Sequence, residues 1–288
     1  MENVLRREHR WRTFSASCYE AEGLVSALDP LTALVVVYAV MASVMLVLWL
    51  VDRWTRDASI ADVGWCIGLV SAVAWYAWST TGDLERKILL LLMAALYGLR
   101  LGLYILLNRV IGKDEDARYQ HLRRERGSYA RIVIFGYFQL QAAAVALFSL
   151  PFLVIMQNVF PPFSLWELAG FLVWLAAVVG EGFADWQLAQ FRSKSWNRDR
   201  VCRDGFWRYS RHPNYFFEWL HWWAYVVMGV STPGWLLTWI GPVGMGWALL
   251  KVTGIPWSER QALVSRGEDY REYQRTTSSF IPWFPKTR

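Results

Sequence analysis

The sequence predicts an all-α, polytopic integral membrane protein with about seven transmembrane helices in one bundle. Hydrophobic residues make up 55% of the 288-residue chain and 19 residues are tryptophan, a composition too apolar for an ordinary soluble domain. The apolar residues come in runs near the ~20 residues that a helix needs to cross the hydrocarbon core. We expect one membrane domain over residues 30–288, preceded by a basic and polar segment, 1–29, and ending in a C-terminal tail at about 256–288.

Seven apolar runs of spanning length follow one another along the chain. They cover about 32–51, 60–80, 88–108, 131–157, 163–186, 212–230 and 233–254, of which the second and the sixth are the least regular. The N-terminal arginines are not followed by an apolar segment with a small-residue cleavage site, so a cleaved signal peptide is not expected. Three widely spaced cysteines predict neither a metal site nor a disulfide framework.

The connections between the runs differ in charge. Those at 109–131 and 187–211 are rich in arginine, as is the C-terminal tail, whereas 158–162 and 231–232 carry no basic residue. By the positive-inside rule, the basic segments and the C-terminus are cytoplasmic. Four arginines in residues 1–29 oppose this orientation, but they lie ~20 residues or more before the first span, at the edge of the range in which the rule applies.

The stretch Arg203–Glu218 runs from a basic loop into an aromatic helix. Pro213 suits the first turn of a helix, because its φ is fixed and it has no N–H to donate. Asn214 and Glu218 then share a face with either His221 or Trp222. A carboxylate in such apolar surroundings needs a partner, which makes it a candidate functional group, although a helix cap anchored at the headgroups is the alternative.

Two other spans carry polar stripes of helical spacing. One face of the third span presents Tyr97, Arg100, Tyr104 and Asn108, and one face of the fifth presents Glu181, Asp185, Leu188 and Arg192. The second span places a further carboxylate, Asp62, in its apolar part. The alternative for the third span is that Arg100 extends toward the headgroups and Tyr104 belongs to the aromatic belt.

Because polar stripes face lipid only at high cost, the simplest arrangement turns all of them into one cavity. Arg192, Arg208 and Arg211 would lie at its cytoplasmic rim, which suits a ligand with a phosphate-bearing end and an apolar reacting end. The chain has no Gly-x-Gly-x-x-Gly and no Walker-type loop, which excludes a soluble Rossmann or P-loop module as the binding site.

These motifs resemble the steroid 5α-reductase superfamily, and most closely its branch of unknown function, DUF1295. The resemblance covers roughly 57–285 and is strongest in 184–192, in 205–218 and in 270–283. It implies a seven-helix protein that uses NADPH within the bilayer to reduce a carbon–carbon double bond conjugated to a ketone. The substrate so implied is a lipophilic small molecule, an enone lipid or sterol-like compound.

The resemblance also assigns roles to residues. It implies that Tyr97 hydrogen-bonds the substrate carbonyl and that Asp62 is the catalytic carboxylate supporting it. The cofactor-binding positions expected from the resemblance and the stripes are Arg100, Tyr104, Asn108, Glu181, Asp185, Arg192, Arg208, Arg211, His212, Asn214, Tyr215, Glu218 and Trp222. The chain departs from steroid-reducing members at Glu181, where they carry an amide, and at Gly254–Glu259, where their His and Tyr have no counterpart.

Two other functions compete with the reductase. An Arg-His-Pro-x-Tyr segment followed by Glu also occurs in isoprenylcysteine and phospholipid methyltransferases, which use S-adenosylmethionine; a non-enzymatic membrane scaffold is the third reading. Arginines crowding the cavity mouth favour a phosphorylated cofactor over a sulfonium. We expect a monomer among membrane lipids, in the endoplasmic reticulum of a eukaryote or the inner membrane of a bacterium, with no nucleic-acid partner.

Overall fold

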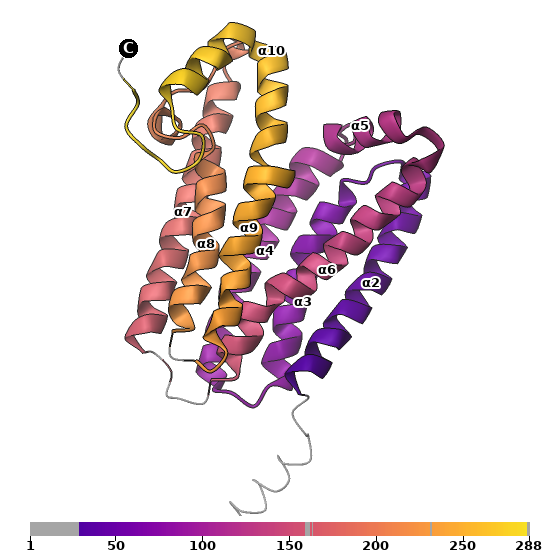
Figure 1. Ribbon diagram of the computed structural model, residues 1–288, viewed down its shortest axis with the longest axis vertical. Coiled ribbons are helices and arrows are strands. Elements are labelled where there is room, and N and C mark those ends of the chain that lie inside the picture. Colours follow the sequence, from indigo (N-terminus) through magenta and orange to yellow (C-terminus); the bar gives the residue numbers. More distant parts are fainter. Residues whose placement is uncertain (1–28, 159–161, 163, 231, 287–288) are drawn as a thin grey trace, which may run out of the picture.

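The computed structural model describes residues 29–158, 162, 164–230 and 232–286, and most of these are helical. The long helices run alongside one another in a single upright bundle (Figure 1). In chain order the α-helices are α2 (Pro30–Thr55), α3 (Ile60–Ser79), α4 (Leu84–Ile105), α5 (Ala117–Arg126), α6 (Ala130–Met156), α7 (Leu165–Arg192), α8 (Pro213–Met228), α9 (Ile240–Trp247) and α10 (Ile255–Thr276). The described part of the chain contains no strand, which confirms the all-α prediction. Residues 1–28 of the predicted N-terminal segment lie outside the described residues.

Six helical stretches of the described chain are long and apolar enough to cross a membrane. They are Pro30–Thr55, Ile60–Ser79, Leu84–Val110, Ala117–Met156, Leu165–Arg192 and Trp235–Thr276. The sixth predicted span is α8, which at 16 residues is shorter than the usual spanning helix but packs against both α7 and α9 inside the bundle. The protein is therefore a multi-pass integral membrane protein, as predicted.

Local sequence accounts for the helix starts that matter for the site. At the start of α7, Ser164 and Glu167 form a reciprocal capping box, in which each side chain satisfies the other residue's backbone N–H. α8 begins at Pro213 as predicted, with His212 immediately before the helix. These two helices consequently start at fixed residues. The start of each helix determines where its polar side chains lie along the bundle axis.

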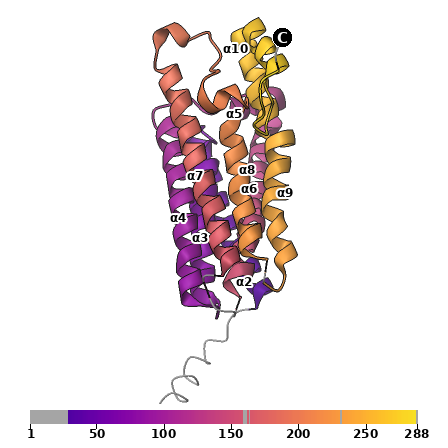
Figure 2. The same cartoon turned by 90° about the vertical axis from the view of Figure 1, so that its left-hand side faces the viewer.

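The bundle has two neighbouring groups of helices. α2, α3, α4 and α6 pack together, and α7, α8 and α9 stand beside them (Figures 1 and 2). α7 and α8 approach closely because α7 carries glycine where α8 presents bulk: a Cβ at Gly180 would lie 2.4 Å from the Phe217 ring, and one at Gly170 would lie 2.2 Å from the Met228 side chain. Close contact between these helices brings their polar stripes within hydrogen-bonding distance.

Short helices and loops gather at one end of the bundle. α5, the connection after α7 and most of α10 lie there, so the three arginine-rich segments share an end of the molecule (Figure 1). α10 is broken at Gly267, whose φ of 53° is left-handed and therefore suits glycine. A π-helical turn, η1 (Leu106–Val110), extends α4 toward the same end. This end holds the candidate site.

Candidate functional site

A cavity of about 430 Å³ opens at the arginine-rich end of the bundle. Its walls come from the last turns of α4 and α7, from η1, from the connection between α7 and α8, from the first turn of α8 and from α10. The predicted site residues that line it are Tyr104, Asp185, Arg192, Arg211, His212, Asn214 and Tyr215. The structure therefore brings together residues from three separate predicted stripes and motifs.

Polar pairs continue from the cavity into the bundle. The Asn214 amide donates to the Asp185 carboxylate with an N–O distance of 3.1 Å. Preceding Asp185 by four residues on α7, Glu181 forms an ion pair with Arg100 of α4 at 2.7 Å. Because Glu181 is only 4% exposed, its charge is compensated by Arg100 rather than by water.

The innermost group centres on Tyr97, which is fully buried. Its hydroxyl donates to the carboxylate of Glu218, four residues after Asn214 on α8. The Tyr97 ring stacks on His221 with a centroid distance of 3.9 Å, and the Nε2 atom of His221 lies 3.0 Å from the Tyr225 hydroxyl. α4 and α8 thus present a phenol, a carboxylate and an imidazole to one another, with the Arg100 guanidinium 6.0 Å from the centre of the Tyr97 ring.

Several enclosed polar atoms of the inner group and of the adjoining Arg100–Glu181 pair have no hydrogen-bond partner among the described residues. They include Oε2 of Glu181, Nε of Arg100 and Nδ1 of His221. Buried polar atoms are normally paired with protein or ordered water, so an unpaired acceptor and ring nitrogen leave hydrogen-bonding capacity for a ligand or water. Of the two alternatives at the end of the α8 stripe, His221 joins the inner group.

Trp222 packs in the core next to the inner group, and its indole lies beside the Glu218 carboxyl group. It is fully buried and packs on Phe148, with ring centroids 4.8 Å apart, and against Gly241 of α9. Its position on α8 follows His221 by one residue, which turns it about 100° around the helix axis and into the core. Trp222 does not line the cavity, and its predicted role in cofactor binding stays a prediction.

Arg211 lines the cavity, but its guanidinium is occupied by protein groups. It contacts the Glu259 carboxylate at 2.6 Å and donates to the backbone carbonyls of Gln274 and Thr277 at 3.0 and 2.7 Å. His212 lies 3.4 Å from the same carboxylate. Arg211 and His212 therefore fasten α10 to the start of α8, and Arg211 has little capacity left for a ligand phosphate.

Two further predicted residues lie outside the cavity wall. Arg208 faces a separate hollow, which it forms with Asp204, Gly205, Thr276, Thr277 and Pro285, and it does not line the cavity. Asn108 is exposed, and its amide donates to the backbone carbonyl of Tyr104 at 2.9 Å. The π-helical turn η1 changes the helical register at this point, so Asn108 does not continue the stripe.

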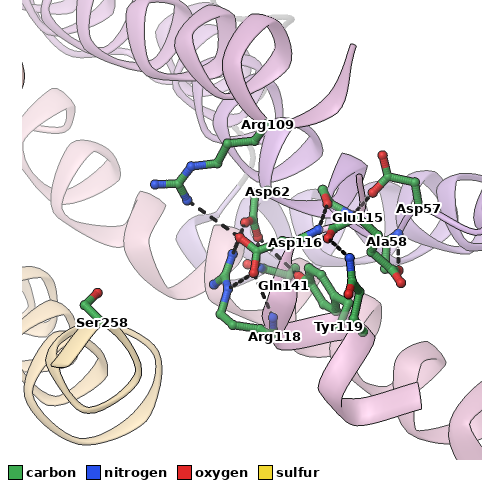
Figure 3. Close-up of polar contacts among 12 residues, drawn as sticks. Asp57, Ala58, Asp62, Arg109, Glu115, Asp116, Arg118, Tyr119, Gln141 and Ser258 are labelled. Carbon is green, nitrogen blue, oxygen red and sulfur yellow. Dashed lines mark hydrogen bonds and ion pairs between the residues drawn. The ribbon is translucent and has the colours of Figure 1, made fainter. Parts of the chain in front are cut away.

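Asp62 belongs to a different polar cluster, shown in Figure 3. Its carboxylate accepts from Arg118 at 2.6 Å, from the Tyr119 hydroxyl at 3.3 Å and from Gln141 at 3.2 Å. These contacts fix α5 to α3 and α6. The carboxylate that contacts Tyr97 is Glu218, so the expected support of the Tyr97 hydroxyl by Asp62 is not what the structure shows.

The cluster around Asp62 extends to the cavity. Asp116 accepts from Arg118 at 2.9 Å and lies 3.9 Å from Arg109, which lines the cavity (Figure 3). Burial alone would raise the pKa of Asp116, but the hydrogen bond and charge of Arg118 lower it below its ordinary value, so Asp116 is ionised at neutral pH. Asp62 and its neighbours therefore act on the site from outside, by positioning α5 and η1.

Sequence reasoning missed three arginines of the cavity wall: Arg109, Arg200 and Arg266. Arg109 and Arg200 stood in the basic connections and Arg266 in the tail, but helical spacing gave no sign of which loop arginines converge. The cavity also includes Cys202, whose thiol pKa is raised by burial, so it is protonated at neutral pH. Among the residues that the structure describes, no group of three His, Cys, Asp or Glu side chains is arranged to hold a metal ion.

Comparison with known proteins identifies a family but no activity. Residues 48–277 match DUF1295, described as a protein of unknown function. No curated protein matches the chain. No solved structure matches it either.

Proposed function

Because the chain belongs to the DUF1295 family, whose description assigns no activity, we propose a function from its site: a membrane-embedded, NADPH-dependent reductase of a carbon–carbon double bond conjugated to a ketone. The observation that supports it is the sequence of groups from the mouth inward. Arginines line the opening, the Asp185–Asn214 pair follows, and the buried Tyr97–Glu218 pair lies at the inner end. The substrate would be an enone lipid or sterol-like molecule that reaches the site from the bilayer.

The described residues fit a phosphorylated dinucleotide. Arginine side chains recognise phosphate by charge-assisted and often bidentate hydrogen bonds. The amide of Asn214 and the carboxylate of Asp185 offer a donor and acceptors suited to ribose hydroxyls or a carboxamide. The unpaired atoms of Glu181 and His221 leave further polar capacity near the inner end. When bound, the nicotinamide supplies the hydride, which is the difficult part of the chemistry.

The protein's own contribution centres on the phenol of Tyr97. As a double bond conjugated to a ketone is reduced, negative charge develops on the carbonyl oxygen, and a positioned hydroxyl stabilises that charge. The Glu218 carboxyl group contacts this hydroxyl and is the nearest described group that can exchange a proton with it. His221, stacked on the ring, fixes the orientation of the phenol. Glu218 thus takes the supporting role that sequence reasoning gave to Asp62.

The competing function is transfer of a methyl group from S-adenosylmethionine. Its sequence signature includes Arg211 and His212, but in the structure both contact Glu259 and fasten α10. A sulfonium cofactor also gives no reason for several arginines in one cavity. These observations favour the reductase. We further propose that the arginine-rich end faces the cytoplasm, where NADPH is available, and that the protein functions as a monomer.

A ligand panel tests this proposal. Detergent-solubilised protein would be heated with NADPH, NADH or S-adenosylmethionine, and the melting temperature recorded. NADPH should raise it most, and an enone lipid should then cause NADPH oxidation by the same preparation. Stabilisation by S-adenosylmethionine alone would support the methyltransferase, and no shift with any of the three would support the scaffold.

A further inference from the structure

We propose that Arg192, Arg200 and Arg266 form a subsite for a phosphate monoester, and that Arg266 makes the protein select NADPH over NADH. This inference rests on the proposed function, since it assigns the phosphate to the 2′-position of the cofactor. The three residues come from the end of α7, from the following connection and from α10, and all line the cavity. Neither Arg200 nor Arg266 belongs to a polar stripe of the sequence.

Among the described residues, no carboxylate compensates the charge of these three arginines. Two other arginines of the same region do have carboxylate partners: Arg203 pairs with Asp269 at 2.6 Å, and Arg211 with Glu259 at 2.6 Å. Within the described chain, no carboxylate oxygen lies within the 4.0 Å ion-pair distance of Arg192, Arg200 or Arg266. Arg192 and Arg200 are exposed and Arg266 is partly buried. Like charges along one cavity wall raise the local positive potential, so this wall is suited to a multiply charged anion.

The Arg266 side chain is held in place by the protein. Its Nε donates to the backbone carbonyl of Arg200 at 3.0 Å, and its Nη1 to the Ser265 hydroxyl at 3.1 Å. Since a guanidinium has five N–H donors, these two bonds leave three for a ligand. The side chain is therefore oriented by the protein and still able to bind, as a specificity residue must be.

Arg266 lies at a corner of α10. The left-handed Gly267 ends the first part of α10 directly after Arg266. Beyond the corner, Asp269 accepts from the backbone N–H of Val201 at 2.9 Å. Residues on both sides of the corner thus contact the 200–201 segment. These contacts fix the backbone of Arg266 relative to that of Arg200.

The position of the three arginines in the cavity indicates which phosphate group of the cofactor they would bind. The reacting end of the ligand belongs near Tyr97, deep between α4 and α8, whereas α10 and the connection after α7 lie at the outer end of the molecule (Figure 1). A dinucleotide with its nicotinamide inward has its adenosine outward. The 2′-phosphate, a monoester with nearly two negative charges at neutral pH, is the group that distinguishes NADPH from NADH at that end.

The experiment compares adenosine 2′,5′-bisphosphate with adenosine 5′-monophosphate, titrated calorimetrically into purified protein in nanodiscs of neutral lipid. The wild type should bind the bisphosphate more tightly. Arg266→Gln should weaken bisphosphate binding roughly 10- to 100-fold, because hydrogen bonds to a charged group are lost, and leave the monophosphate within about twofold. The matched control is Arg271→Gln on the same helix, whose side chain is 67% exposed and pairs with Glu268 outside the cavity.

Each outcome decides a separate question. Equal affinity for the two nucleotides, or equal loss in Arg266→Gln and Arg271→Gln, overturns the subsite. Nanodiscs containing phosphatidic acid test the lipid as the source of the phosphate: Arg266-dependent binding of that lipid with no nucleotide binding also overturns the proposal. If the bisphosphate binds as expected but no enone is reduced, the subsite stands and the proposed reductase activity fails.

Discussion

Tyr97→Phe removes one hydroxyl from the inner end of the site and keeps the ring. In the structure this hydroxyl donates to Glu218, and both side chains are buried, with Tyr97 0% and Glu218 9% exposed. Stacking of the ring on His221 at 3.9 Å should survive the change. The substitution therefore isolates the donor from the packing, which a change to Ala would not do.

Two magnitudes follow from that geometry. Loss of a preorganised donor to a developing oxyanion costs about 10²–10³ in turnover. Loss of the partner of buried Glu218 costs about 1–3 kcal/mol of stability. Nucleotide affinity should stay close to that of the wild type, because the phosphate-binding arginines lie in the outer cavity wall. The assay is single-turnover oxidation of NADPH with an enone lipid, alongside an NADPH titration.

Tyr76→Phe is the matched control. Tyr76 is also fully buried, and its hydroxyl lies 3.0 Å from that of Ser149, away from the cavity. This variant should lose stability of the same order and keep its turnover. Reduction of the enone by Tyr97→Phe at the wild-type rate would show that the active site is misplaced, and parallel losses in both variants would show that the effect is one of folding alone.

Four other predictions concern the surroundings of the site. Asn214→Ala removes the donor to Asp185 and should weaken NADPH binding about tenfold, with a matching loss of activity. NADPH titration and turnover would be measured on one preparation, and unchanged affinity with lost turnover would contradict this role. Asp62→Asn should lower the melting temperature by weakening the contact with Arg118, with NADPH affinity nearly unchanged; a selective loss of turnover would restore Asp62 as a catalytic residue. Gly267→Ala meets no neighbouring atom but forces a left-handed alanine, so it should destabilise α10 by about 1 kcal/mol and weaken bisphosphate binding in the same calorimetric assay. Deletion of residues 276–288 removes backbone acceptors that hold the start of α8 and should weaken NADPH binding, whereas unchanged affinity would favour a plain membrane anchor.

Helical periodicity was sufficient for the parts of the site that lie on long helices. Spacings of three and four residues put Tyr97 and Arg100 on one face of α4, and Glu181 and Asp185 on one face of α7, because the rotation per residue is constant within an α-helix. The same rule could not choose between His221 and Trp222, since both lie near the stripe. That choice depends on how α8 is rotated against its neighbours, which is a property of packing.

The remaining errors arise from long-range contacts. Asp62 is one acid in an apolar helix, and its partner Arg118 comes from a connection that folds into α5 and returns to the bundle. Arg266 shares one face of α10 with Ser258 and Ala262, and that whole face lines the cavity. Local sequence does not determine where such a connection or broken helix packs. Charge therefore identified the basic segments, but it could not identify which of their residues come together in the cavity wall.

The pairing of α4 with later helices has a consequence for biosynthesis. Arg100 and Tyr97 belong to the third predicted span, while Glu181 and Glu218 belong to the fifth and sixth. As the chain is made from its N-terminus, Arg100 approaches the membrane before its counter-ion exists, and a central arginine raises the free energy of helix insertion by about 2.5–3.5 kcal/mol. We expect α4 to remain shallow, or to stay beside the insertion machinery, until α7 arrives with Glu181. On this expectation, truncation of the chain before α7 would leave α4 without the counter-ion of Arg100.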